Sequence, residues 1–246
     1  MANEPHPPHP PRLPRATETA DPGGLDLPRY AVRLPPPVTL RYALQRGAAA
    51  GTASLHWQPG LGRYALTLQA QLPGQPALAW ASTGAIDAGG LAPERYAESR
   101  RGREQRAANF EPDRGRIRFS GTDAERPLPP GAQDRLSWLA QLAGVLAATP
   151  ALAAPGQAIR LYVAGARGEG GVWVFRVLGA EALALAAGPR STLRLLREPE
   201  QPYDTRAEVW LDPARAHLPV RVRWQAPPAP QATELTLQEP GADGSP

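Results

Sequence analysis

Residues 130–150, PGAQDRLSWLAQLAGVLAATP, constrain the fold more than any other stretch, because their apolar residues repeat with the helical period over several turns. The spacing predicts one long α-helix over about 133–148. Most of its circumference is apolar, and a narrow polar line interrupts it. That line comprises Asp134, Ser137 and Gln141, while Trp138 and Leu142 belong to an apolar stripe. A helix of this kind must be covered on more than one side.

From residue 38 onward the apolar period changes to two, which is typical of strands that bury one face. In VTLRYAL and RYALTLQAQL polar and apolar residues alternate, and the turn sequences PGLG and PGQP follow such segments. This pattern indicates an antiparallel meander of about thirteen strands. Sheet is the material available to cover the helix. We therefore predict a mainly β fold, with a strongly curved antiparallel sheet (half-barrel or open barrel) wrapped around one long α-helix.

Composition divides the chain into three parts. Eleven of the 31 prolines fall in the first 37 residues, so we predict a disordered Pro-rich segment over 1–36. A single curved-sheet domain is expected over 37–239, followed by a loose C-terminal tail over 240–246. The sequence shows no apolar run long enough for a transmembrane helix or a signal-peptide core.

The stretch AEVWLDPARAHLPVRVRW predicts a β-hairpin whose register follows from its polarity. If Leu211 faces Leu218, apolar residues pair with one another on one face of the hairpin. On the other face, the same register pairs Glu208 with Arg221. We therefore expect an ion pair between these two side chains.

A second hairpin, over 95–118, turns near Gly102 and is crowded with arginine. Interleaved glutamates lower its net charge, and the whole chain carries a formal charge of only +4. We therefore expect a solvated hairpin and no nucleic-acid partner. Its candidate partner surface comprises Arg100, Arg101 and Arg103.

No catalytic or metal-binding signature is found in the sequence. The chain has no cysteine, and all 27 basic residues are arginine, which excludes thiol chemistry and the lysine of a P-loop. His56 and His217 lie inside the domain, and no pattern joins either one to a serine and a carboxylate. Asp134 is expected to cap the helix. We therefore predict that the protein is not an enzyme and has no catalytic residue, metal site or cofactor.

Three segments resemble a known family: PGAQDRLSWLAQL, ERYAESRRGREQRAANFE and TRAEVWLDPARAHLPVRVRW. They are similar to segments of the bacterial domain-of-unknown-function family 3108, uncharacterised envelope proteins of proteobacteria, over about residues 38–238. The resemblance implies a periplasmic or envelope-associated protein with a curved sheet around a helix and no known reaction. Members usually begin with a signal peptide or membrane anchor, so the resemblance also implies a missing segment upstream of Met1.

Together these observations predict a noncatalytic cell-envelope protein that serves as a binding or scaffold module. In one version a lipid or other apolar ligand, or an envelope protein, lies beside the helix, and the candidate surface is Asp134, Ser137, Trp138, Gln141 and Leu142. In the alternative the core is solid and the arginines of the basic hairpin contact a protein partner. A third alternative, an uncharacterised enzyme, requires a cavity lined by Asp134, Gln141 and His56. A solid interior and a ligand cavity need the same apolar faces, so the sequence leaves both open.

Overall fold

The computed structural model describes residues 25, 27–202, 204–227 and 229–240. The first eight strands are β1 (Val38–Arg46), β2 (Ala49–Pro59), β3 (Arg63–Gln71), β4 (Leu78–Asp87), β5 (Gly90–Arg100), β6 (Arg103–Glu111), β7 (Arg116–Phe119) and β8 (Glu125–Pro127). The remaining strands are β9 (Gln133–Asp134), β10 (Ala158–Ala164), β11 (Gly170–Leu185), β12 (Gly188–Arg197), β13 (Arg206–Asp212), β14 (Leu218–Gln225) and β15 (Thr233–Pro240). The described helices are α1 (Trp138–Ala148) and the short 3-10 helices η1 (Pro112–Arg114), η2 (Pro150–Ala153) and η3 (Pro213–Arg215).

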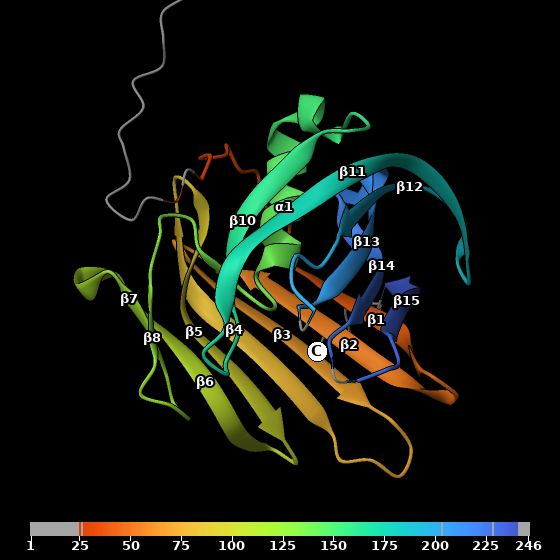
Figure 1. Cartoon of the computed structure of the whole chain (residues 1–246). Coiled ribbons are helices and arrows are strands. Elements are labelled where there is room, and N and C mark those ends of the chain that lie inside the picture. Colours follow the sequence, from red (N-terminus) through yellow and green to blue (C-terminus); the bar gives the residue numbers. More distant parts are fainter. Residues whose placement is uncertain (1–24, 26, 203, 228, 241–246) are drawn as a thin grey trace, which may run out of the picture.

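All fifteen described strands belong to one sheet, in the order β8-β7-β6-β5-β4-β3-β2-β1-β15-β14-β13-β12-β11-β10-β9 (Figure 1). Neighbouring strands are antiparallel, except that β9 pairs with β10 in parallel. The pairing of β1 with β15 joins the two halves of the chain in the middle of the sheet. The predicted mainly β class, the large antiparallel sheet and its helix are confirmed.

The sheet is open, with β8 and β9 at its two ends, and it is not strongly curled. The predicted strong curvature, as a half-barrel or open barrel, is therefore not found. From the sequence, we predicted that the sheet alone covers the helix. In the structure α1 contacts β5, β9, β10 and β14, and irregular chain supplies a further part of the cover.

This irregular cover is residues 27–37, which we call the covering segment; its first part is red in Figure 1. Tyr30, Val32 and Leu34 of this segment pack against the core. The Arg33 amide donates to the Gly144 carbonyl at 3.0 Å. Residues 27–36, which the prediction of disorder over 1–36 included, instead form an extended segment whose alternating apolar side chains pack on the helix. Residues 1–24, residue 26 and most of the predicted tail, 241–246, lie outside the described residues.

The helix is shorter than predicted, since it begins at Trp138 rather than near residue 133. Gln133 and Asp134 form β9, and the Asp134 carboxylate accepts hydrogen bonds from the amides of Leu136 and Ser137, both at 2.8 Å. These bonds hold a turn just ahead of the helix. The expectation that Asp134 caps the helix is therefore wrong, because its side chain closes the preceding turn and the N-cap residue Ser137 makes no side-chain cap hydrogen bond.

The β13–β14 hairpin has a different register from the predicted one. Leu218 pairs with Asp212 rather than with Leu211, and a bulge after Trp210 shifts the remaining pairs further. The cause is the turn, in which the Asp212 side chain accepts from the Ala214 amide at 3.0 Å. The predicted Glu208–Arg221 ion pair is therefore wrong. Glu208 contacts Arg194 at 2.6 Å and Arg206 at 3.4 Å, whereas Arg221 contacts Glu234 at 2.8 Å.

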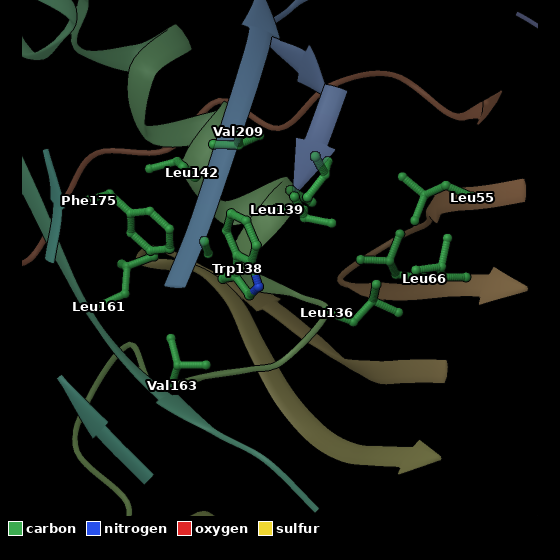
Figure 2. Packing of buried hydrophobic residues seen from close by; sticks show 14 of the residues in the cluster. Leu55, Leu66, Leu136, Trp138, Leu139, Leu142, Leu161, Val163, Phe175 and Val209 are labelled. Carbon is green, nitrogen blue, oxygen red and sulfur yellow. The ribbon is translucent and has the colours of Figure 1, made fainter. Parts of the chain in front are cut away.

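The interior beside α1 is filled. Figure 2 shows Trp138, Leu139 and Leu142 of α1 between Leu161 and Phe175 on one side and Leu55 and Leu66 on the other. The void beside the helix measures about 10 Å³, which is room for about one water molecule. Its lining comprises Pro35, Val38, Leu55, Trp57, Leu66, Leu139, Ala140, Ala143, Leu218 and Pro219. Of the two alternatives left open by the sequence, the described residues show the solid interior.

Candidate functional site

Asp134 lies at the centre of a buried hydrogen-bond network at the amino end of α1. Its carboxylate accepts from the Ser82 hydroxyl of β4 at 2.5 Å, and Ser82 also bonds the Tyr64 hydroxyl of β3 at 2.9 Å. The Ser137 hydroxyl accepts from the Asp134 amide at 2.8 Å. Complete burial raises the pKa of Asp134 to about 6, although these donors oppose the shift. Asp134 and Ser137 thus fix the start of the helix to the sheet.

Gln141 fastens the middle of the helix to the β4–β5 turn. Its side-chain oxygen accepts from the Leu91 amide at 2.9 Å, and its side-chain nitrogen donates to the Gly89 carbonyl at 2.7 Å. Gln133 donates to the Leu91 carbonyl at 2.8 Å from just ahead of the helix. The hydrogen-bonding groups of Asp134, Ser137 and Gln141, which were predicted to belong to a ligand or partner surface, are therefore used within the fold.

Trp138 belongs to a buried aromatic cluster, and Leu142 is fully buried. The ring of Trp138 stacks on Phe175 with centroids 4.8 Å apart and lies 6.0 Å from Trp173. Both candidate residues are covered in this structure, so a ligand would reach them only after other chain had moved away.

Two arginines that sequence reasoning missed cover the ring of Trp173. The guanidinium groups of Arg135 and Arg197 lie 4.7 Å and 4.8 Å from its centroid, within the range of cation–π attraction. Arg197 is buried and binds Asp204 and the Thr205 carbonyl. Burial lowers the pKa of Arg135. No local sequence pattern marks these arginines, since their partners lie on distant segments.

The covering segment contacts a part of α1 that has small side chains. A Cβ atom added to Gly144 would lie 2.5 Å from Cγ1 of Val32, so glycine permits this close approach. Nη2 of Arg33 donates to the carbonyl oxygen of Ala147 at 2.6 Å. At its C-terminal end the segment is held by the Trp57 indole, which donates to the Pro35 carbonyl at 2.9 Å. We call this contact area, centred on Gly144 and Ala147, the covered face of α1.

The candidate arginines of the basic hairpin are exposed, unlike the buried hydrogen-bond network around Asp134. Arg100, Arg101 and Arg103 are exposed at the β5–β6 turn, and the turn falls at Gly102 as predicted. Within the described residues, none of the three has a carboxylate oxygen within 4.0 Å. They form a separate cationic surface.

The residues required for an enzymatic cavity do not come together. The His56 ring bonds Thr39 and Ser54, both at 3.2 Å, whereas Asp134 and Gln141 have the partners given above. Burial, followed by the nearby Arg33 charge, lowers the pKa of His217. In the part of the chain that the structure covers, no three His, Asp or Glu side chains are grouped as metal ligands.

None of the described helices is long and apolar enough to cross a membrane.

These features define a class of protein: an open, mostly antiparallel β-sheet with one buried helix, which polar side chains fasten to the sheet. Within this class the chain belongs to the DUF3108 family of proteins of unknown function, whose model matches residues 38–236. The resemblance expected from the three sequence segments is thereby confirmed. The covering segment precedes the matched region.

Among solved structures, the fold is similar to a beta-barrel-like protein of domain of unknown function DUF1849 from Brucella abortus. The two share 14% sequence identity with a TM-score of 0.53, over 85% of this chain and 98% of that chain. The chain also matches the structure of MucB at 12% identity and a TM-score of 0.33, over 86% of this chain and 55% of that chain. The second score is too low to support an inference. The comparison with curated proteins found no match.

Proposed function

We propose that this protein is a noncatalytic binding module of the cell envelope, in which the covered face of α1 receives an extended apolar polypeptide segment of a partner protein. In the described structure the protein's own covering segment lies there. The observation that carries the proposal is that an irregular segment, rather than a strand or helix, covers a buried apolar helix. The envelope location is supported by the family resemblance.

The contacts of the covering segment indicate what kind of occupant the covered face suits. Val32 and Leu34 face the helix while Ala31 and Arg33 are exposed, which is the alternation of an extended peptide. The Arg33 amide bonds the helix backbone at Gly144. An acyl chain could fill the apolar positions but could not supply this backbone donor, so a polypeptide fits better than a lipid.

The proposal requires that the covering segment can be exchanged for a partner segment. Tyr30, Val32 and Leu34 are only partly buried. Residues 27–37 form no strand pairing with the sheet. A partner segment with similar side chains would replace these contacts with equivalent ones, and the helix would remain covered throughout the exchange.

A peptide-binding experiment tests the proposal. The variant Val32→Asp/Leu34→Asp weakens the native cover by placing charges against apolar surface. A fluorescent peptide with the sequence of residues 25–37 should bind this variant and bind the unmodified protein much less. A matched peptide carrying both aspartates should bind neither.

The outcomes are decisive. Failure of the peptide to bind the folded variant would refute the proposal. Unfolding of the variant, seen by circular dichroism, would also refute it, because the segment would then be an integral part of the core. Binding of a fluorescent fatty acid with no binding of the peptide would replace the polypeptide partner with a lipid.

A second candidate, a protein-interaction surface on the basic hairpin, is favoured by the exposure of Arg100, Arg101 and Arg103 without nearby carboxylates in the described structure. Charge reversal of all three to glutamate should abolish a pull-down partner from envelope extract if this surface is used. An unchanged set of partners would remove this candidate.

A further inference from the structure

A polar groove lies away from α1, where three segments distant in sequence meet. It has a volume of about 210 Å³ and is lined by Arg106, Gly121, Thr122, Ala166 and Arg167. Arg106 belongs to β6, Gly121 and Thr122 to the β7–β8 connection, and the other two residues to the β10–β11 turn. The groove therefore depends on the tertiary fold and not on one local motif.

The charge of the groove is positive. Arg106 and Arg167 are both exposed, and no acidic residue is part of the lining. The described residues offer Arg106 no carboxylate oxygen within 4.0 Å, and they offer Arg167 only Glu98, at 3.9 Å. Glu98 also accepts from the Tyr96 hydroxyl, at 3.3 Å. Two arginines thus line one polar space, and in the described residues Glu98 is the one carboxylate within 4.0 Å of either guanidinium group.

The walls of the groove are held in place by hydrogen bonds. Nε of Arg126 donates to the Gly168 carbonyl at 3.0 Å, which ties the β10–β11 turn to β8. Ser120 bonds the backbone of Ala107 in both directions: its amide donates to the Ala107 carbonyl at 2.9 Å, and its hydroxyl accepts from the Ala107 amide at 2.8 Å. Gly168 has φ 91°, a conformation that favours glycine, and sits over Thr122. The two arginines therefore project from fixed backbone.

We propose that this groove binds a phosphate group. A compact oxyanion matches the groove, because a guanidinium group donates to phosphate oxygens in a paired geometry and two arginines line this groove. Thr122 also lines the groove, and its hydroxyl is a further potential donor. The volume is below that of a pocket for a drug-sized ligand, which is about 300 Å³ or more. The groove thus takes the phosphate group and leaves the rest of its carrier outside.

Titration of inorganic phosphate into the full chain, followed by calorimetry and by backbone amide shifts, tests this site. The expected result is saturable binding at one site, with shifts at Thr122 and Arg167. Arg106→Gln and Arg167→Gln should each weaken binding by about tenfold or more, as expected for loss of a charge-assisted hydrogen bond. The control Arg41→Gln removes the same charge from an exposed position on β1 and should leave the affinity within about twofold.

A second arm identifies the source of the phosphate. Vesicles of phosphatidylcholine containing phosphatidylglycerol are compared with vesicles of phosphatidylcholine alone, using the same variants. Retention on the anionic vesicles that is lost in both groove variants would identify a lipid headgroup, and phosphate binding without vesicle binding would identify a soluble phosphate compound. The proposal is overturned if neither probe binds, or if Arg41→Gln weakens binding as much as the groove variants.

Discussion

Replacing Gly144 by alanine tests whether the covering segment rests on the helix as described. In the interior of a helix, alanine is more favourable than glycine by about 1 kcal/mol. Here the added Cβ would lie 2.5 Å from Cγ1 of Val32 and 3.2 Å from Cδ2 of Leu34. Overpacking of this kind costs about 1–3 kcal/mol. We expect the clash to exceed the gain, so the free energy of unfolding should fall by up to about 2 kcal/mol.

A double-mutant cycle with Val32→Ala separates the two effects. This change removes Cγ1 of Val32, and the nearest remaining atom is then Cδ2 of Leu34. In that background Gly144→Ala should be neutral or stabilising by up to about 1 kcal/mol. Urea unfolding of the four proteins gives the coupling energy directly. Additivity within about 0.5 kcal/mol, or stabilisation of the unmodified chain by Gly144→Ala, would refute the contact.

Two further predictions concern Asp134, which lies just ahead of the helix, and Gln141 within it. The folded pKa of Asp134, about 6, lies above its ordinary value of 3.8, so the folded state favours the protonated acid. Its contribution to stability is therefore present below about pH 4 and lost as the pH rises through 6. Between these limits the free energy of unfolding should fall by about 3 kcal/mol relative to Asp134→Asn, measured by urea unfolding at each pH; parallel pH profiles for the two proteins would contradict this. Gln141→Leu leaves the Leu91 amide and the Gly89 carbonyl without their partner, so chemical unfolding should show a loss of about 1–3 kcal/mol for each group. The exposed control Gln69→Leu should change the stability by less than about 0.5 kcal/mol, and an equally small effect of Gln141→Leu would show that its two hydrogen bonds do not matter.

The sequence indicated the main elements because each depends on a periodic pattern. Alternation from residue 38 onward marked the strands, and spacings of three and four marked the helix. The covering segment could also have been found from the alternation of Tyr30, Val32 and Leu34. The prolines around it favoured a prediction of disorder, and composition was given more weight than the pattern.

Other features depend on tertiary contacts that a single sequence does not show. The polar line of Asp134, Ser137 and Gln141 was visible, but its partners Ser82 and Leu91 are about fifty residues away. The polar line was therefore interpreted as a ligand surface rather than as a fastening of the helix.

The register of the last hairpin failed for a different reason. It depends on the turn, where Ala216 and His217 both adopt a left-handed conformation with φ 52° and 56°. Alanine does not favour that conformation, so the residue pattern did not indicate the shortened turn or the bulge after Trp210.

Whether the covering segment lies on the covered face of α1 is tested most directly by a nuclear Overhauser measurement between the methyl protons of Val32 and the α-protons of Gly144 in the full chain. Strong cross-peaks are expected, with matching contacts between Leu34 and the helix, because these side chains pack on α1. Sharp random-coil signals for residues 27–37 with no contact to α1 would contradict this placement.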